Sequence, residues 1–274
     1  MKKDYKVTFI GAGNMGEAMI KGLLEAGLPA KNIFAIDIDK KRIQYICSKY
    51  KVKKPADLKT GLSKDATIIA VKPQQLDNLL QYIAGLELNL PLIISIAAGI
   101  PVKRFTDSLG AKTRVIRVMP NTPALIGKGV SGYFAGPGCQ KKDLSLAEDV
   151  MSGLGPAYQL TDESLMDAVT GLSGSGPAYV FAIVDALADA GVMMGLSRDM
   201  ALGLAANTVM GAAAMVTETG EHPSVLKDKV ASPGGTTIAG IAAMERGRFR
   251  AALMDAVAAA TERSRELGRS KEEE

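Results

Sequence analysis

The chain has 274 residues, of which 47% are hydrophobic and 23% charged, enough for one large or two ordinary soluble domains. Its net charge of +4 is small and evenly spread, which disfavours nucleic acid as a partner and suits an anionic cofactor or substrate. Cys47 and Cys139 lie far apart without metal-ligand spacing, and the first residues lack a signal-peptide pattern, so we expect a cytoplasmic protein with free thiols and no bound metal.

A glycine-rich turn near the start organises the chain. A β-prone segment begins at Val7, and Gly11, Gly13 and Gly16 then precede a helix-forming segment. The first glycine permits the tight turn, the second lets a pyrophosphate approach the backbone, and the third lets the helix pack close to the strand. The free N–H groups and positive dipole end of that helix face the phosphates. We interpret this stretch as a dinucleotide-binding turn rather than a plain glycine-rich turn. Its predicted cofactor-binding residues are Gly11, Ala12, Gly13, Asn14, Met15 and Gly16.

Strand and helix signals alternate as far as residue 161. The apolar runs after the first are nearly continuous, which is the pattern of parallel strands buried on both faces. Strands are predicted at 33–36, 67–71, 92–96, 114–118, 130–134 and 157–160, and helices up to residue 26 and at 39–50, 74–84, 101–109 and 141–153. Residues 1–161 are therefore predicted to form a doubly wound α/β domain of the Rossmann type.

From residue 162 the strand signal stops, and an all-α domain is predicted over 162–274. Ser197 is the expected N-cap of one helix, and Pro223 suits the first position of another. Helices are expected at 162–171, 177–195, 198–217, 223–230, 236–246 and 249–267.

The apolar helices of this second half predict self-association. The run 201–216 is rich in Ala, Gly and Met and nearly uncharged. A helix that is apolar all round must be buried, and a small helical domain buries few such helices alone. We therefore expect a homodimer, with a compact monomeric bundle as the alternative. Asp185 and Asp189 interrupt the most apolar run, 177–196, and argue against a membrane span.

Acidic and basic residues compete for the adenosine end of the cofactor. Asp37 follows the second strand, 21 residues after Gly16, where a carboxylate accepts hydrogen bonds from ribose hydroxyls and repels a 2′-phosphate. Lys40, Lys41 and Arg42 follow closely and would suit that phosphate instead. A solvated helix start is the third interpretation. The pattern favours NADH slightly and leaves NADPH open.

Small residues and prolines follow the next three strands. The segments are Val71-Lys72-Pro73, Ala97-Ala98-Gly99 and Met119-Pro120-Asn121-Thr122-Pro123. Ligands in such sheets bind beyond the carboxyl ends of the strands, and stiff loops suit a flat nicotinamide and its ribose. Lys72 fits the ribose or phosphates, with a surface lysine as the alternative.

Two glycine-rich stretches interrupt the helical half, at 172–177 and 231–238. We expect each to open a helix with free N–H groups that suit a carboxylate, the alternative being a simple turn. His222 is the only histidine and is interpreted as structural or neutral, and the sequence shows no Ser–His–Asp set or Cys–His pair. Reduction of a protonated imine needs no added proton, unlike that of a ketone. A hydroxyl such as Thr237 then suffices to orient the imine nitrogen.

Over its whole length the chain resembles the Δ1-pyrroline-5-carboxylate reductases. The matching segments are 9–16, 71–73, 119–123, 167–179 and, most specifically, 232–238. The resemblance implies reduction of pyrroline-5-carboxylate to L-proline with NADPH or NADH. It also implies a Rossmann domain followed by a helical dimerisation domain, with dimers that often assemble into larger rings such as decamers.

The resemblance also assigns residues. The cofactor side comprises the glycine-rich turn with Asp37, Asp57, Val71, Lys72, Pro73, Ala97, Ala98, Gly99 and Asn121. The substrate side comprises Glu163, Ser175, Lys229, Gly234, Gly235, Thr236 and Thr237, with Thr237 as the catalytic candidate. The chain departs from the family at three of these positions, where Ser or Asn–Arg is common for Asp37, Asn for Asp57, and Asn or Gln for Lys229.

Two other functions are compatible with the layout. The β-hydroxyacid dehydrogenases share this layout, but they resemble one another in having a catalytic lysine within the first long helices of the second domain. This chain has no lysine between Lys142 and Lys227, which counts against that function. A non-catalytic NAD(P)-binding regulatory protein would not need a second anion site, which the segment 232–238 supplies.

Overall fold

The structure is a computed structural model that describes residues 4–269. It divides into two compact units, one reaching to Gly174 and completed by the chain from Ala259, the other spanning Ser175–Ala258. The last part of the final helix thus belongs to the first unit. The functional boundary predicted after residue 161 falls where the last strand has ended and stays a prediction.

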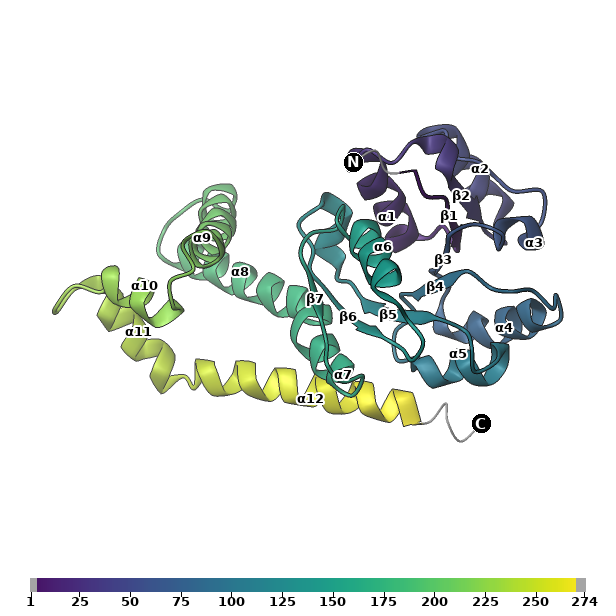
Figure 1. Ribbon diagram of the computed structural model, residues 1–274. Coiled ribbons are helices and arrows are strands. Elements are labelled where there is room, and N and C mark those ends of the chain that lie inside the picture. The colour runs from purple at the N-terminus through teal and green to yellow at the C-terminus, as the bar shows by residue number, and fades with distance from the viewer. Residues whose placement is uncertain (1–3, 270–274) are drawn as a thin grey trace. The chain divides into compact units, whose positions relative to one another are not determined.

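A seven-stranded sheet forms the centre of the first unit (Figure 1). Its strand order is β2-β1-β3-β4-β5-β6-β7, and all neighbours pair in parallel except β5 and β6, which are antiparallel. The predicted strands are confirmed. The strands are β1 (Val7–Ile10), β2 (Ile33–Ile36), β3 (Ala66–Ile69), β4 (Leu92–Ser95), β5 (Val115–Met119), β6 (Ser131–Ala135) and β7 (Ala157–Gln159).

Helices cover both faces of this sheet, as the doubly wound prediction requires (Figure 1). Consecutive strand residues point to opposite faces. Ile68 therefore packs in one cluster with α1, α2 and α6, whereas Ile69 packs in another with α4 and α5. The helices of this unit are α1 (Asn14–Glu25), α2 (Lys40–Tyr50), α3 (Leu58–Gly61), α4 (Leu76–Ala84), α5 (Val102–Leu109), α6 (Lys141–Met151) and α7 (Leu165–Val169).

The second unit is helical, as predicted. Ser197 caps the second of its helices by accepting a hydrogen bond from the Met200 N–H, and Pro223 lies at the start of the third. His222 has the structural role expected of it, because its Nδ1 caps that third helix by accepting from the Ser224 N–H. The helices are α8 (Gly176–Met193), α9 (Arg198–Thr219), α10 (Pro223–Lys229), α11 (Thr236–Arg246) and α12 (Phe249–Arg269), which ends in the first unit.

The stretch 172–177 opens a helix as expected, because α8 begins at Gly176 with Ser175 as an N-cap that makes no side-chain hydrogen bond, but no loop separates it from α7. Residues Thr170–Gly174 form a π-helical turn, so helical structure continues from α7 into α8. The hydroxyls of Thr170 and Ser173 each bond the carbonyl four residues earlier, on Met166 and Val169. Such bonds compete with the α-helical ladder and bend it, and glycines leave room for the wider turn.

The apolar helices of the second unit are largely exposed within one copy of the chain. Only Ala201 and Ala205 of α9 are buried, while Met210 is 64% exposed. By length and composition alone, Leu165–Met193 and Arg198–Thr219 would also suffice to cross a membrane, although core helices of soluble proteins pass the same test. The apolar face of α9 therefore requires a cover that a single copy does not provide.

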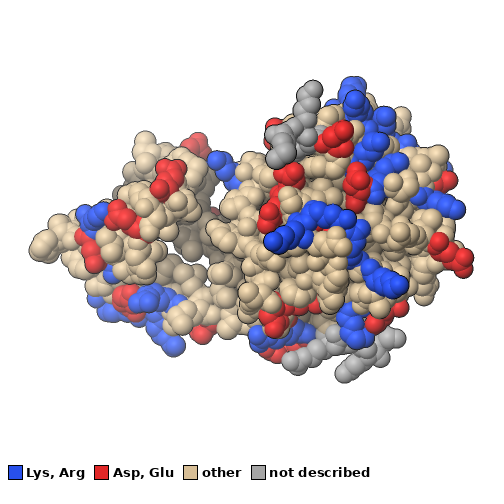
Figure 2. All heavy atoms as spheres, in the orientation of Figure 1, with Lys and Arg blue, Asp and Glu red and all other residues tan. Residues whose placement is uncertain are grey.

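On the face that Figure 2 shows, positively and negatively charged side chains of the described residues lie among one another, and neither sign covers a large area. This agrees with the small, evenly spread net charge of the sequence. Groups of three or more metal-ligating side chains do not occur between residues 4 and 269.

Candidate functional site

The glycine-rich turn connects β1 to α1 and leaves room for a ligand against the backbone. Gly11 has φ +95°, and a Cβ there would lie 2.6 Å from the Ala70 carbonyl oxygen. A Cβ on Gly13 would meet nothing within 4 Å. Gly13 also caps α1 without a side-chain hydrogen bond, so the N–H groups of the first turn are available. The turn therefore fits a pyrophosphate.

Asp37 lies at the carboxyl end of β2 and binds the turn directly. Its Oδ2 accepts from the Ala12 N–H at 2.7 Å, and its Oδ1 accepts from the Asp39 N–H at 2.9 Å. The two bonds fix the carboxylate beside the turn, where the ribose of a dinucleotide is expected.

Arg42 and Glu17 also lie beside this turn, and their contacts there were not predicted from the sequence. Arg42 Nε donates to the Ala12 carbonyl oxygen at 2.5 Å, and its Nη2 lies 2.5 Å from Glu17 Oε2. Glu17 also accepts from Lys49 at 3.0 Å and from the Tyr50 hydroxyl at 2.8 Å. The sequence did contain a signal for these contacts, because Glu17 is an acidic residue in the first turn of a helix that is expected to bind phosphates. Its negative charge would repel the phosphates unless cations neutralise it.

The cluster around Glu17 predicts a stability change in acid. Partial burial would raise the pKa of Glu17, but hydrogen bonds from Lys49, Tyr50 and Arg42 outweigh it and lower the pKa from 4.5 to about 2. The unfolded chain therefore binds the proton first, so this stabilisation is complete above the unfolded pKa and is lost as the pH falls through about 2. We expect the free energy of unfolding, measured in urea, to fall less steeply below the unfolded pKa in Glu17→Gln than in the unmodified chain. Equal slopes would contradict the assignment.

The segments after β3 and β4 lie at the same sheet edge as the glycine-rich turn, because parallel strands end together. Lys72 is exposed and precedes a 3-10 turn, Pro73–Gln75. Asn121 follows β5, and its amide is used structurally: Nδ2 donates to the Ser173 carbonyl at 3.1 Å and Oδ1 accepts from the Val130 N–H at 3.0 Å. Asp57 caps α3 by accepting from the Thr60 N–H. Direct cofactor contact by these residues stays a prediction.

Glu163 belongs to the first unit and lies near the start of α5. Its Oε1 accepts from the Val102 N–H at 2.8 Å and from Arg117 of β5 at 3.0 Å. Glu163 and Arg117 line a hollow of about 370 Å³ that Asp167 also lines. Asp167 accepts from the Ser264 hydroxyl at 2.6 Å, which ties α7 to the end of α12.

The other predicted substrate residues belong to the second unit. Gly235 caps α11 without a side-chain hydrogen bond, and Thr236 and Thr237 form its first turn. Gly234 precedes them with φ +66°. Farther from this turn in sequence, Lys229 ends α10 and bonds both carboxylate oxygens of Glu221, at 2.7 and 2.5 Å. Ser175 is the N-cap of α8. The structure thus gathers the glycines and threonines of one predicted anion site at one helix N-terminus.

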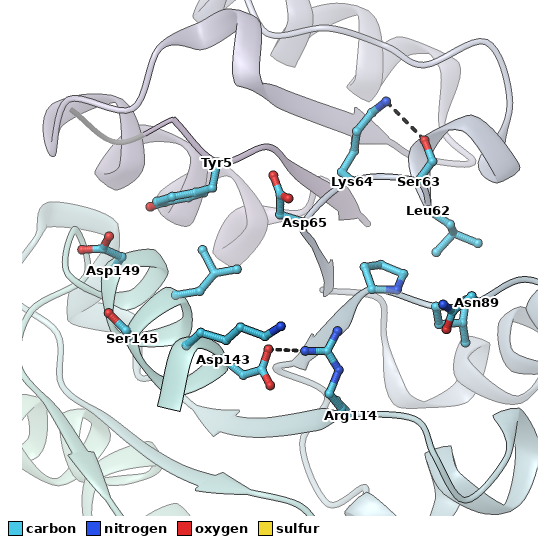
Figure 3. A pocket seen from close by; sticks show the side chains of 14 residues that line it. Tyr5, Leu62, Ser63, Lys64, Asp65, Asn89, Arg114, Asp143, Ser145 and Asp149 are labelled. Atoms are coloured by element: carbon cyan, nitrogen blue, oxygen red, sulfur yellow. Dashed lines mark hydrogen bonds and ion pairs between the residues drawn. The ribbon is translucent and has the colours of Figure 1, made fainter. Parts of the chain in front are cut away.

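A hollow of about 810 Å³ opens at the opposite edge of the sheet, where the strands begin (Figure 3). Asp65 directly precedes β3 and Arg114 directly precedes β5. Figure 3 shows Arg114 facing Asp143 of α6, with which it forms an ion pair. Because ligands of open α/β sheets bind beyond the carboxyl ends of the strands, this larger hollow is not the candidate site.

The fold and the turn together define the class of protein. A mostly parallel sheet with a glycine-rich pyrophosphate turn, an acidic residue after the second strand and a helical second unit is the layout of a two-domain NAD(P)-dependent oxidoreductase.

Comparisons with known proteins identify the family. The family model for pyrroline-5-carboxylate reductase dimerisation matches residues 163–267, and one for coenzyme F420-dependent NADP oxidoreductases matches residues 6–99. Pyrroline-5-carboxylate reductase of Methanosarcina acetivorans is 45% identical over 97% of this chain and 99% of that protein. Pyrroline-5-carboxylate reductase of Arabidopsis thaliana is 42% identical over 98% of this chain and 97% of that protein. The chain belongs to the pyrroline-5-carboxylate reductase family.

Solved structures agree. The Coxiella burnetii pyrroline-5-carboxylate reductase matches with a TM-score of 0.92 and 34% identity, covering 97% of this chain and 99% of that one. The Plasmodium falciparum pyrroline carboxylate reductase, solved with NADP bound, matches with a TM-score of 0.85 and 31% identity over 98% and 100%. The predicted fold class and family are confirmed.

Proposed function

We propose that this chain reduces 1-pyrroline-5-carboxylate to L-proline, the last step of proline biosynthesis, with NADH or NADPH. The observation that carries the proposal is the uncapped start of α11, where Gly235 precedes two threonines and leaves N–H groups for a carboxylate. It supplies a second anion site in a chain that already has a dinucleotide turn. Relatives that match over nearly their whole length are named for this activity.

The cofactor, when bound, supplies the hydride. The chain's part is to hold it: the first turn of α1 donates N–H groups to the pyrophosphate, and Asp37 accepts from the ribose. The loops at the sheet edge are proposed to line the nicotinamide side. The full set is Gly11, Ala12, Gly13, Asn14, Met15, Gly16, Asp37, Asp57, Val71, Lys72, Pro73, Ala97, Ala98, Gly99 and Asn121.

The substrate is proposed to be held rather than activated by acid–base chemistry. The N–H groups at the start of α11 bind its carboxylate, and the Thr237 hydroxyl orients the ring nitrogen. Because the protonated imine already carries its proton, orientation in a fixed site accounts for most of the rate. In the second unit, Ser175, Lys229, Gly234, Gly235 and Thr236 are further proposed substrate residues, and Glu163 is the proposed substrate residue of the first unit.

The assembly is proposed to be a homodimer, and the proposal extends to rings of dimers such as decamers. The exposed apolar face of α9 and the match to a dimerisation family model support it. A second copy packed on that face would bury the two apolar helices, so no membrane is needed to cover them, and we propose a cytoplasmic protein. Light scattering of the purified chain measures the mass of the assembly and so tests the proposed homodimer.

The two predicted domains are proposed to have separate roles. Residues 1–161 would bind the cofactor, and residues 162–274 would bind the substrate and the partner copy.

The activity is tested by following oxidation of NADH and NADPH in the presence of pyrroline-5-carboxylate. Oxidation that depends on the imine and yields proline supports the proposal. Binding of a cofactor with no turnover would instead favour a regulatory protein, and oxidation with β-keto acids alone would favour a β-hydroxyacid dehydrogenase.

Replacing Thr237 by alanine is expected to lower kcat/KM for the imine by about 10- to 100-fold, the order that a lost orienting hydrogen bond costs. Thr237→Ser keeps the hydroxyl and should recover most of the loss. Thr219→Ala is the control, since its hydroxyl bonds only backbone at the end of α9: it accepts from the Glu221 N–H and donates to the Met215 carbonyl. An unchanged kcat/KM in Thr237→Ala would remove this residue from the mechanism.

A further inference from the structure

We propose that Arg42 is a positioning residue that locks the glycine-rich turn beside Asp37, and that the Asp37 carboxylate makes this site selective for NADH. The inference rests on the proposed function, because it concerns the dinucleotide of that same site. It assigns Arg42 to the turn's backbone and takes it away from a 2′-phosphate.

The peptide groups of Ala12 are held from two sides. Its N–H donates to Asp37 Oδ2 at 2.7 Å, and its carbonyl oxygen accepts from Arg42 Nε at 2.5 Å. Ala12 itself is fully buried. Charge-assisted bonds of this kind are stronger than neutral ones, so the pair fixes both the turn and the carboxylate.

The guanidinium of Arg42 is directed into the protein. Besides the Ala12 carbonyl it bonds Glu17 through Nη2, and it lies 5.3 Å from the centre of the Tyr45 ring. Its side chain is 25% exposed. These contacts engage Nε and Nη2 with the turn and with Glu17 of α1.

Asp37, in contrast, is placed to accept a hydrogen bond from a free ribose hydroxyl. Its carboxylate is fixed by the N–H groups of Ala12 and Asp39, and a carboxylate oxygen has a second lone pair for a ribose hydroxyl. A 2′-phosphate at the same place would face the like charge of Asp37, while Arg42 is already paired with Glu17. Lys40 and Lys41, both exposed at the start of α2, are the remaining cations of this segment.

Calorimetric titration of the full chain with NADH and with NADPH, without substrate, tests the assignment. We expect NADH to bind at least about tenfold more tightly, the scale of one charged contact. Asp37→Asn keeps an acceptor for Ala12 but removes the charge, so NADH should weaken, NADPH should strengthen and the preference should shrink by about tenfold or more.

Arg42→Met distinguishes positioning from phosphate binding. If Arg42 acts through the turn, both dissociation constants rise by a similar factor, about 10-fold, and their ratio stays the same. KM for NADH should rise with little change in kcat, and Arg42→Lys should recover part of the affinity. Loss of NADPH binding alone would overturn the assignment, as would tighter binding of NADPH by the unmodified chain.

Lys49→Met is the matched control, because Lys49 also pairs with Glu17, at 3.0 Å, but does not bond Ala12. Its dissociation constants should change less than about twofold. An effect as large as that of Arg42→Met would place the cause in the charge of Glu17 and refute the lock. Selective NADH binding without turnover would refute the reductase activity alone, whereas turnover with NADPH preference would refute this inference alone.

Discussion

Replacing Gly11 by alanine is expected to abolish measurable dinucleotide binding and to lower the free energy of unfolding by about 3 kcal/mol or more. The φ of +95° is costly for a residue with a Cβ. The added carbon would also lie 2.6 Å from the Ala70 oxygen, 2.7 Å from its carbonyl carbon and 2.9 Å from the Val71 nitrogen. All three are backbone atoms, so no side chain can rotate away.

Relief of this contact would have to move the end of β3. The Ala70 N–H bonds the Ile10 carbonyl at 2.8 Å, and the Gly11 N–H bonds the Ile36 carbonyl at 2.8 Å, so three neighbouring strands meet there. A shift would misplace the start of α1, where the pyrophosphate binds. Urea unfolding measures the stability, and calorimetry measures the cofactor affinity.

Gly13→Ala separates the two effects. A Cβ at Gly13 meets nothing within 4 Å, and the residue has an ordinary φ of −63°. Glycine is favoured over alanine at a helix N-cap, the position that Gly13 occupies in α1, so the free energy of unfolding should fall by no more than about 1 kcal/mol. Dinucleotide affinity should still fall, because the carbon occupies the space that the pyrophosphate approaches. Native stability in Gly11→Ala, or full affinity in Gly13→Ala, would contradict this account of the turn.

The elements of the fold follow from local pattern, which is why they were predictable. The apolar runs at β3, β4 and β5 carry their signals within a few residues, as do Ser197 and Pro223 at the starts of α9 and α10. The antiparallel direction of β6 has no such local signal. It follows from a short connection of one 3-10 turn, Thr122–Ile126, after β5.

What the sequence could not supply depends on contacts between distant residues. Glu17 and Arg42 meet across 25 positions, and Glu163 meets Arg117 across 46. The π-helical turn before α8 depends on two hydroxyls bonding backwards, which the glycine-rich pattern alone reads as a break. Of the proposed site, the glycines and Asp37 were predictable from spacing, whereas the partner that orients each charged side chain was not.

Gly153→Ala is expected to be as damaging as Gly11→Ala, although Gly153 lies in no predicted site. Gly22 of α1 and Gly153, just after α6, touch backbone to backbone. A Cβ on Gly153 would lie 2.2 Å from the Gly22 carbonyl carbon and 2.4 Å from its Cα and oxygen. We expect a loss of more than about 3 kcal/mol in urea unfolding, the upper range for overpacking, because helix α1 itself must move.

This displacement should also reach the cofactor, since α1 begins at the glycine-rich turn. Molecules that stay folded should bind the dinucleotide more weakly than the unmodified chain. Gly85→Ala is the matched control: a Cβ there would have its nearest neighbour at 3.6 Å, with an ordinary φ of −66°, so stability and affinity should stay within about 1 kcal/mol. The variant with both Gly22→Ala and Gly153→Ala should lose less than the sum of its single changes, because the first alanine already separates the two backbones. Strict additivity, or a Gly153→Ala variant as stable as Gly85→Ala, would show that α1 does not depend on this contact for its position.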